Sequence, residues 1–194
     1  MVSLENVTAW YPMRVTYNRE LRIKDLLDAL HIENFLPMKK ILVDTVEGYP
    51  RWELKPAINN LIFVRSTRNI LTELKTTKRE FSPMRYMRCA PSVINPVVGG
   101  RLLTVSNREM ENFMRVASVQ DDSITYLENT DYINQVGKKV RVLGGPFSGL
   151  EGVVKRIKKN RFFVVQIKGI VAVAVTTIPH YLLEEIKEKQ TDET

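Results

Sequence analysis

Cysteine and histidine are almost absent from this chain of 194 residues, which has one cysteine, Cys89, and two histidines, His31 and His180. A single cysteine excludes an internal disulfide and a zinc site built from several thiolates of one chain. No histidine lies near Cys89 in the sequence, so we expect a buried, inert thiol rather than a nucleophile. The histidines lie at a predicted helix end and after Pro179, where a capping or surface role is the simplest interpretation.

Long hydrophobic runs and catalytic motifs are also missing. The longest apolar run, residues 170–175, is far shorter than the roughly 20 residues of a membrane helix. The first residues lack the basic and apolar regions of a signal peptide. No nucleotide-binding glycine motif, nucleophile elbow or metal-ligand cluster occurs, and no pair of carboxylates stands out for acid–base catalysis. We therefore expect a cytoplasmic protein that is not an enzyme, makes no membrane contact and uses no metal or cofactor.

Positive charge is in excess, with 29 lysine and arginine residues against 22 acidic ones and a net charge of +7. This excess favours a polyanionic partner such as nucleic acid, although a basic soluble protein without such a partner fits it equally well. Charge and glycine are unevenly distributed along the chain, because residues 119–134 are acidic and most glycines follow residue 136. We expect a domain over 1–118, an acidic linker over 119–134, a second domain over 135–186 and a charged tail over 187–194.

The first domain alternates between extended and helical patterns. The expected elements are strands over 9–15, 41–46, 61–64 and 85–88, a helix over 19–31 and two more beginning near 67 and 107. Asn18 and Thr67 are expected to cap the first two helices, and Ser106 with Glu109 forms a capping box before the third. The apolar residues expected to face the core from the first two helices are Ile23, Leu26, Leu27, Leu30, Ile70, Leu71 and Leu74. The pattern predicts an α+β sandwich in which helices cover one sheet.

The second domain consists almost entirely of short strand patterns. About five strands, from 139–142 to 181–183, can bury an apolar face only by curling into a small barrel. Gly145 and Pro146 are expected to turn the chain, and Phe147 to close the barrel end. Gly152 would let its strand approach the first strand without a Cβ. An ordinary SH3-like barrel hairpin would use glycine in a similar way.

Strings in both domains carry a resemblance to a known family. Residues 140–154 contain V-x-V, G-P-F and G-V-V elements and resemble the KOW motif of NusG-family and ribosomal proteins. Residues 10–15, 35–37 and 60–64 look like parts of the NusG amino-terminal (NGN) domain. The resemblance covers about residues 9–186. It implies an NGN α/β sandwich with an antiparallel sheet, followed by a small SH3-like β-barrel, the KOW domain.

A narrower resemblance is to the UpxY-type antiterminators of capsular polysaccharide operons, which share residues 14–17, 32–38, 60–67 and 169–174. It implies a monomeric elongation and antitermination factor that binds RNA polymerase and promotes processive transcription of a capsular or exopolysaccharide operon. The alternative is a ribosome-associated RNA-binding KOW protein that couples transcription to translation. A ribosomal KOW protein, however, would lack the pattern of residues 9–118.

The family resemblance also implies a polymerase-binding site. In relatives, a hydrophobic pocket of the NGN domain docks onto the clamp helices of the polymerase's largest subunit. The matching positions are Phe63 and Leu61, with Ile58 and Tyr11 as neighbours. Strand alternation puts Leu61 and Phe63 on one face and the intervening residues on the other, so one set can serve the core and the other the pocket. The other interpretation is a central strand buried on both faces, and Leu61 departs from specialised relatives, which often carry an aromatic residue there.

Regulated relatives also read the non-template DNA strand, and nascent RNA is the alternative ligand. The matching positions are Tyr17, Asn18, Arg19 and Arg22, and further basic candidates on the second helix are Arg68 and Lys75. Aromatic and basic residues together suit single-stranded nucleic acid, because bases stack on the ring and guanidinium groups meet phosphates. A solvated helix face without a ligand explains Arg19 and Arg22 equally well.

The KOW domain implies a protein partner. Its motif residues are Gly145, Pro146, Phe147 and Gly152, and in relatives this domain binds a small-subunit ribosomal protein or a termination factor. The basic turn over 155–161 is either a solvated turn that discourages edge pairing or a contact for RNA or the ribosome.

Overall fold

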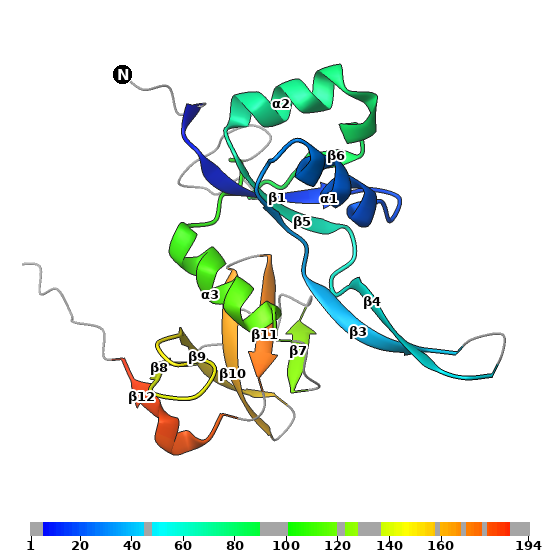
Figure 1. Ribbon diagram of the computed structural model, residues 1–194. Helices are drawn as coiled ribbons and strands as arrows, with labels where there is room; N and C mark the ends of the chain where they lie inside the picture. The colour runs from blue at the N-terminus through cyan, green and yellow to red at the C-terminus, as the bar shows by residue number, and fades with distance from the viewer. Residues whose placement is uncertain are drawn as a thin grey trace, which may run out of the picture. The chain divides into compact units, whose positions relative to one another are not determined.

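The computed structural model describes residues 6–44, 48–89, 101–119, 123–127, 137–157, 160–167, 170–175 and 178–186. The predicted tail over 187–194 lies outside these ranges. The chain forms two compact units, Met1–Met114 and Arg115–Thr194, whose elements are labelled in Figure 1. Each unit is described by itself below.

A four-stranded antiparallel sheet is the centre of the first unit. It consists of β1 (Ala9–Val15), β2 (Asn34–Phe35), β5 (Leu61–Ser66) and β6 (Met84–Tyr86), in the order β2-β5-β1-β6. The strand expected over 9–15 is confirmed, and β5 and β6 lie where extended segments were expected. The short β2 overlaps the string over 35–37 that resembles a later strand of the NGN domain, although alternation alone does not predict a strand of two residues.

Helices cover both faces of this sheet, which confirms the predicted α+β sandwich. On one face, α1 (Glu20–Ala29) and α2 (Arg68–Thr77) bury a core that includes Leu27, Ile62 and Leu71. On the other, Phe113 of α3 (Asn107–Ala117) lies with its ring centroid 6.1 Å from that of Phe35 and 5.5 Å from that of Phe63. Figure 1 shows α2 and α3 on opposite sides of the strands.

Helix starts agree with the sequence at two of three positions. The Thr67 hydroxyl accepts a hydrogen bond from the Ile70 N–H at 3.3 Å, and the Ser106 hydroxyl accepts one from the Glu109 N–H, also at 3.3 Å. The Asn18 cap is wrong, because Arg19 occupies the cap position of α1 without a side-chain cap.

Three expected burials are also wrong, although most of the predicted core residues are buried. Leu30 follows the end of α1 and is 37% exposed, and Ile70 lies on the outer side of the first turn of α2 with 45% exposure. Cys89 is exposed, and its Sγ donates a hydrogen bond to the carbonyl of Arg101.

A separate two-stranded ribbon interrupts the first unit between β2 and β5. It consists of β3 (Met38–Val43) and β4 (Arg51–Pro56), which pair antiparallel from Met38–Pro56 to Val43–Arg51. Figure 1 shows the ribbon extending away from the four-stranded sheet. The strand expected over 41–46 begins earlier, at Met38, and its last two residues lie outside the described ranges.

The second unit is a six-stranded antiparallel sheet. Its strands are β7 (Ile124–Leu127), β8 (Lys138–Val142), β9 (Glu151–Ile157), β10 (Asn160–Ile167), β11 (Val171–Val175) and β12 (Leu183–Glu185), in the order β12-β8-β9-β10-β11-β7. Five of them correspond to the strands predicted for an SH3-like fold. The sixth, β7, comes from the segment expected to be an acidic linker, because Thr125 and Leu127 are paired with residues of β11.

Candidate nucleic-acid interface

The turn between β1 and α1 has an unusual backbone. Tyr17 and Asn18 have φ angles of 66° and 50°, which is uncommon for residues other than glycine and persists where neighbouring structure holds the chain. Two hydrogen bonds hold the strand end: the Val15 N–H donates to the Asn60 carbonyl at 3.0 Å and the Thr16 N–H to the Pro83 carbonyl at 3.2 Å. The turn is therefore fixed at its entry.

A buried carboxylate holds the other end of the turn. Glu20, the first residue of α1, is 3% exposed and accepts a hydrogen bond from the N–H of Asn60. Asn60 itself has a positive φ of 60° and directly precedes β5. Asn60 thus forms backbone hydrogen bonds on both sides of the Tyr17–Asn18 turn, with Val15 before it and Glu20 after it.

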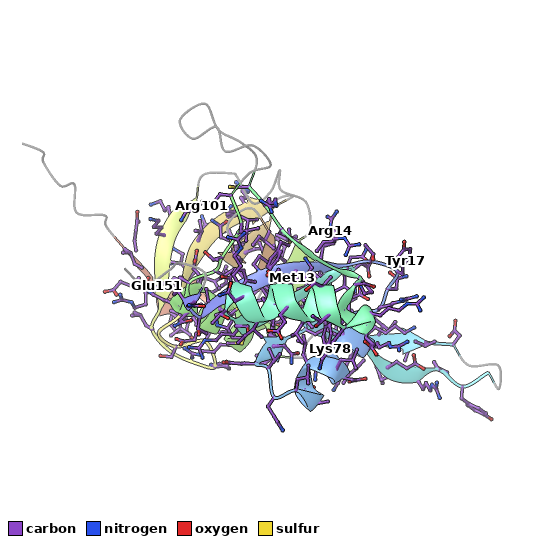
Figure 2. The ribbon with its side chains drawn as sticks, turned by 90° about the horizontal axis from the view of Figure 1, so that it is seen from above. Met13, Arg14, Tyr17, Lys78, Arg101 and Glu151 are labelled. Atoms are coloured by element: carbon purple, nitrogen blue, oxygen red, sulfur yellow. The ribbon has the colours of Figure 1, made fainter. Side chains whose placement is uncertain are left out.

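This anchored turn presents an aromatic ring to solvent. The Tyr17 side chain is 80% exposed, and the guanidinium carbon of Arg19 lies 5.5 Å from its ring centroid, within cation–π range. Figure 2, viewed from above, shows Tyr17 and Arg14 at the outside of the unit, whereas Met13 lies within it. An exposed ring beside a guanidinium group is the arrangement on which a nucleic-acid base can stack.

Three arginines line a depression beside the same turn. It has a volume of about 240 Å³ and is bordered by Arg19, Arg22 and Arg79, with Ile23 and Glu80. Arg79 opens the short helix η2 (Arg79–Phe81) that follows α2. Three guanidinium groups against one carboxylate favour an anion such as phosphate. The structure therefore brings Arg19 and Arg22 together as predicted and adds Arg79, which the sequence did not single out.

A second pair of arginines lies on the face of the sheet opposite to α1 and α2. Arg14 and Arg85 are exposed Cα partners on β1 and β6. Nη1 of Arg85 donates to the carbonyls of Ser82 and of Met84, the latter at 2.9 Å. Their strand neighbours Met13, Val15 and Met84 belong to the core under α1 and α2, so these two arginines are on the opposite face of the sheet and do not border the depression.

Lys75, a further candidate on α2, packs against a tyrosine. Its Nζ lies 4.3 Å from the ring centroid of Tyr86. Burial, with smaller contributions from Arg85 and Arg88, lowers the pKa of Lys75. Burial likewise raises the pKa of Tyr86. Lys75 therefore contributes to packing at this edge, while Arg68 on the same helix is exposed.

The residues expected to bind polymerase are buried and lie on different faces of the sheet. Phe63 is 0% exposed, and Leu61, Ile58 and Tyr11 are each 5% exposed. Leu61 and Phe63 share a face, as the alternation predicted, but Tyr11 is paired with Val64 and belongs to the core under α1 and α2. The expectation that Tyr11 lies beside Phe63 is therefore wrong. Pro12 is the cross-strand partner of Phe63, and Tyr11, the next residue along β1, faces the opposite side of the sheet.

The KOW turn folds tightly. Gly145 has a φ of 77°, and its carbonyl accepts a hydrogen bond from the Ser148 N–H at 3.1 Å. Phe147 is buried beside an apolar cavity of about 170 Å³ that is also lined by Pro146, Ile178 and Leu182. This turn could present an apolar hollow to a partner.

Gly152 is needed for a reason other than the expected one. A Cβ at this position would lie 2.7 Å from the Phe163 ring and from the Val164 carbonyl oxygen. The close approach is therefore to β10, whereas the sequence suggested β8.

One cation of the basic run over 155–161 is not at the surface. Lys155 is only 4% exposed, its Nζ lies 3.4 Å from Oε1 of Gln166, and burial lowers its pKa. Arg156 and Arg161 are exposed, and Lys158 and Lys159 lie outside the described residues.

The described residues contain no helix long and apolar enough to cross a membrane. Nor do those ranges contain a group of three or more histidine, cysteine, aspartate or glutamate side chains placed to hold a metal ion.

Comparison with protein families agrees with this architecture in both units. The family model described as transcription termination factor NusG matches residues 8–114, more than half of the chain, and the KOW motif matches residues 136–168. No curated protein matches the sequence. Proteins of this family are regulatory rather than catalytic, and they generally bind RNA polymerase. The chain therefore belongs to the NusG family of transcription elongation and antitermination factors.

Proposed function

We propose that this chain binds RNA polymerase and promotes processive transcription through terminators, while Tyr17 and its neighbouring arginines hold single-stranded nucleic acid. The non-template DNA strand of the transcription bubble is the proposed ligand. The observation that carries the proposal is the exposed Tyr17 ring, held in a left-handed turn beside a depression lined by Arg19, Arg22 and Arg79. A base on the ring and phosphates on the guanidinium groups would use every part of this arrangement.

The target operon is proposed from sequence alone. Residues 14–17, 32–38, 60–67 and 169–174 resemble UpxY-type antiterminators, so we propose a capsular or exopolysaccharide operon. Asn34 within one of these strings bonds to Asp28 of α1, so part of the shared sequence supports packing.

Polymerase binding through Leu61 and Phe63 belongs to the same proposal. These side chains are 5% and 0% exposed, and the ring of Phe113 lies against Phe63. Docking there would require Phe113 to move.

For the KOW domain we propose a protein partner, either a small-subunit ribosomal protein or a termination factor. The support is the apolar cavity beside Phe147.

Transcription in vitro through a terminator tests the proposal. The template carries the leader of a capsular operon from the organism that encodes the chain, and full-length RNA is compared with terminated RNA. Wild-type protein should raise the full-length fraction, and Arg22→Ala combined with Arg79→Ala should reduce that gain. Lys24→Ala is the matched control, because Lys24 lies on α1 but is already paired with Asp28 at 2.5 Å.

Two outcomes would reject the proposal. If wild-type protein leaves the fraction of terminated RNA unchanged, antitermination is excluded as the function. If the protein sediments with ribosomes and fails to bind polymerase, the chain acts as a ribosome-associated factor instead.

A further inference from the structure

One face of the β3–β4 ribbon is apolar and open. Leu42 and Trp52 are directly opposite each other in the register, and Lys40 is opposite Leu54, so these four side chains form one block. The exposed fractions are 54% for Leu42, 62% for Trp52 and 50% for Leu54. Lys40 is the one charged residue among the six strand positions of this face, which also include Met38 and Pro56.

The opposite face of the ribbon has a different character. Glu53 accepts hydrogen bonds from Arg51 and lies 3.6 Å from Nζ of Lys55. Its pKa is held below the ordinary value, chiefly by the hydrogen bond from Arg51. Charge on that face is thus partly compensated, whereas the apolar face carries a cation and no carboxylate.

The apolar block differs from the other exposed apolar residues of the first unit. Among the described residues these lie outside the strands, on the amino-terminal segment, α1, α2 or turns, and none is the cross-strand partner of another: Val7, Tyr17, Leu21, Leu30, Tyr49 and Ile70. Single exposed apolar side chains are common on soluble proteins, but a contiguous group that includes tryptophan is typical of a protein-binding surface.

We propose that the ribbon face formed by Lys40, Leu42, Trp52 and Leu54 is a docking surface for RNA polymerase. This inference rests on the proposed function, which supplies the partner. The side chains of this face require a polymerase surface with an apolar hollow that accepts the Trp52 ring and an acidic side chain opposite Lys40. The family-derived residues Leu61 and Phe63 are buried, so the ribbon offers a surface that needs no prior rearrangement.

Charge distribution favours a protein over nucleic acid at this face. The two strands carry four cations and one carboxylate, but three of the cations lie on the face opposite Trp52. The Trp52 ring could stack on a base, but a nucleic-acid backbone would meet only one lysine on this face. The two leucines beside the ring offer neither stacking nor a bond to phosphate. An acidic protein surface with an apolar hollow complements both the leucines and Lys40.

Polymerase affinity tests the inference directly. Fluorescently labelled full-length protein is titrated with core RNA polymerase from the organism that encodes it, and the dissociation constant is measured by anisotropy. Trp52→Ala and Leu54→Ser should each weaken binding by about tenfold or more, as expected for central apolar contacts. Ile70→Ser is the matched control, because Ile70 is 45% exposed on α2 of the same unit. Circular dichroism should show similar thermal midpoints for all variants, because each replaced residue is already about half exposed to water.

The wild-type titration separates the inference from the proposed function. If wild-type protein does not bind polymerase, both are overturned. If wild-type protein binds and Trp52→Ala binds equally well, only the ribbon face is excluded. A loss of single-stranded DNA binding in Trp52→Ala with unchanged polymerase affinity would assign the face to nucleic acid. Wild-type dimers in sedimentation velocity that Trp52→Ala abolishes, again with unchanged polymerase affinity, would assign it to a second copy of the chain.

Discussion

Tyr17 shows how a single residue can serve ligand binding at a cost to the fold. Its φ of 66° suits glycine better than tyrosine, yet the ring is 80% exposed and contributes little to the core. Backbone strain of this kind is of order 1–3 kcal/mol and is commonly found at functional sites. The residue is therefore explained more simply by a ligand than by stability.

Replacing this tyrosine should separate binding from stability. We expect Tyr17→Gly to weaken binding of a short single-stranded DNA by about 1–3 kcal/mol, the contribution of one stacked base. The free energy of unfolding should not fall, because glycine adopts the left-handed conformation without strain. Anisotropy and urea denaturation measure the two effects. Tyr49→Gly, which removes a ring with 79% exposure, is the control, and equal DNA affinity for both variants would contradict the assignment.

Gly152 makes the opposite case, in which a residue serves the fold alone. We expect Gly152→Ala to lower the free energy of unfolding by about 1–3 kcal/mol, because its Cβ would overlap the Phe163 ring and a backbone carbonyl. Gly144→Ala should cost less than about 0.5 kcal/mol, since its Cβ would lie 3.3 Å from the flexible end of Leu182. Urea denaturation compares the two, and equal losses would argue against close β9–β10 packing as the cause.

At the scale of elements, structure that depends on signals within one segment could be predicted from the sequence. Structure that depends on pairing between distant segments could not. The strand over 9–15 and the capping box at Ser106 follow from alternation and from hydrogen bonds three residues apart. The strand β7 depends on pairing with β11, some fifty positions later, and its four residues show no clear alternation. Asn18 was expected to cap α1, but the Asn60 bonds impose a left-handed turn there instead.

Site residues follow the same division. The family resemblance supplied Tyr17, Arg19 and Arg22, and these residues are close enough in sequence to be seen as a basic and aromatic cluster. Arg79 reaches the same depression only because η2 packs beside α1, and a Lys-Arg pair after a helix is otherwise typical of a solvated end. Tyr11 and Phe63 could not be assigned to opposite faces without the register between β1 and β5.

The contact of β7 with the end of α3 should give the second unit an alkaline sensitivity. The Tyr126 hydroxyl donates to the Ala117 carbonyl at 3.1 Å, and burial raises the pKa of Tyr126 to about 12. In the unfolded chain a tyrosine ionises near 10. The unfolded state therefore loses its proton first, so this stabilisation is complete below pH 10 and is lost as the pH rises towards 12.

Tyr126→Phe should remove this sensitivity. Urea unfolding of the full chain between pH 9 and pH 12 should show a smaller decline for the variant than for wild type, by up to about 2 kcal/mol after allowance for partial exposure. At neutral pH the variant should lose about 1 kcal/mol with the hydrogen bond to Ala117. Parallel declines for the two proteins would show that Tyr126 does not titrate as described.

At the scale of the whole molecule, the net charge of +7 becomes informative only where cations gather around a feature of the right shape. Arg19, Arg22 and Arg79 surround a depression beside an exposed ring. On the ribbon, Lys40 alone lies on the apolar face and the other three cations lie on the opposite face, while Lys155 is buried. These cations thus divide among the proposed nucleic-acid site, the ribbon with its proposed polymerase contact, and the core of the second unit.

Salt dependence should report how many cations meet phosphate. Plotting the logarithm of DNA affinity against the logarithm of salt concentration gives a slope of about −0.7 for each phosphate contact to a single strand. We expect Arg79→Ala to make the slope shallower by about 0.7, and Lys24→Ala to leave it unchanged because Asp28 already pairs with that lysine. Identical slopes for wild type and Arg79→Ala would remove Arg79 from the interface.

Asn60 joins the end of β1, the start of α1 and the first residue of β5 through its own backbone groups. In the proposed complex, the base that stacks on Tyr17 is therefore held at a constant span from the strand that contains Leu61 and Phe63. The fixed distance between Tyr17 and the polymerase-binding strand would determine which nucleotide the domain selects. A recognition element moved by one nucleotide would then present its neighbour to Tyr17, and the spacing of the element would matter as much as its sequence.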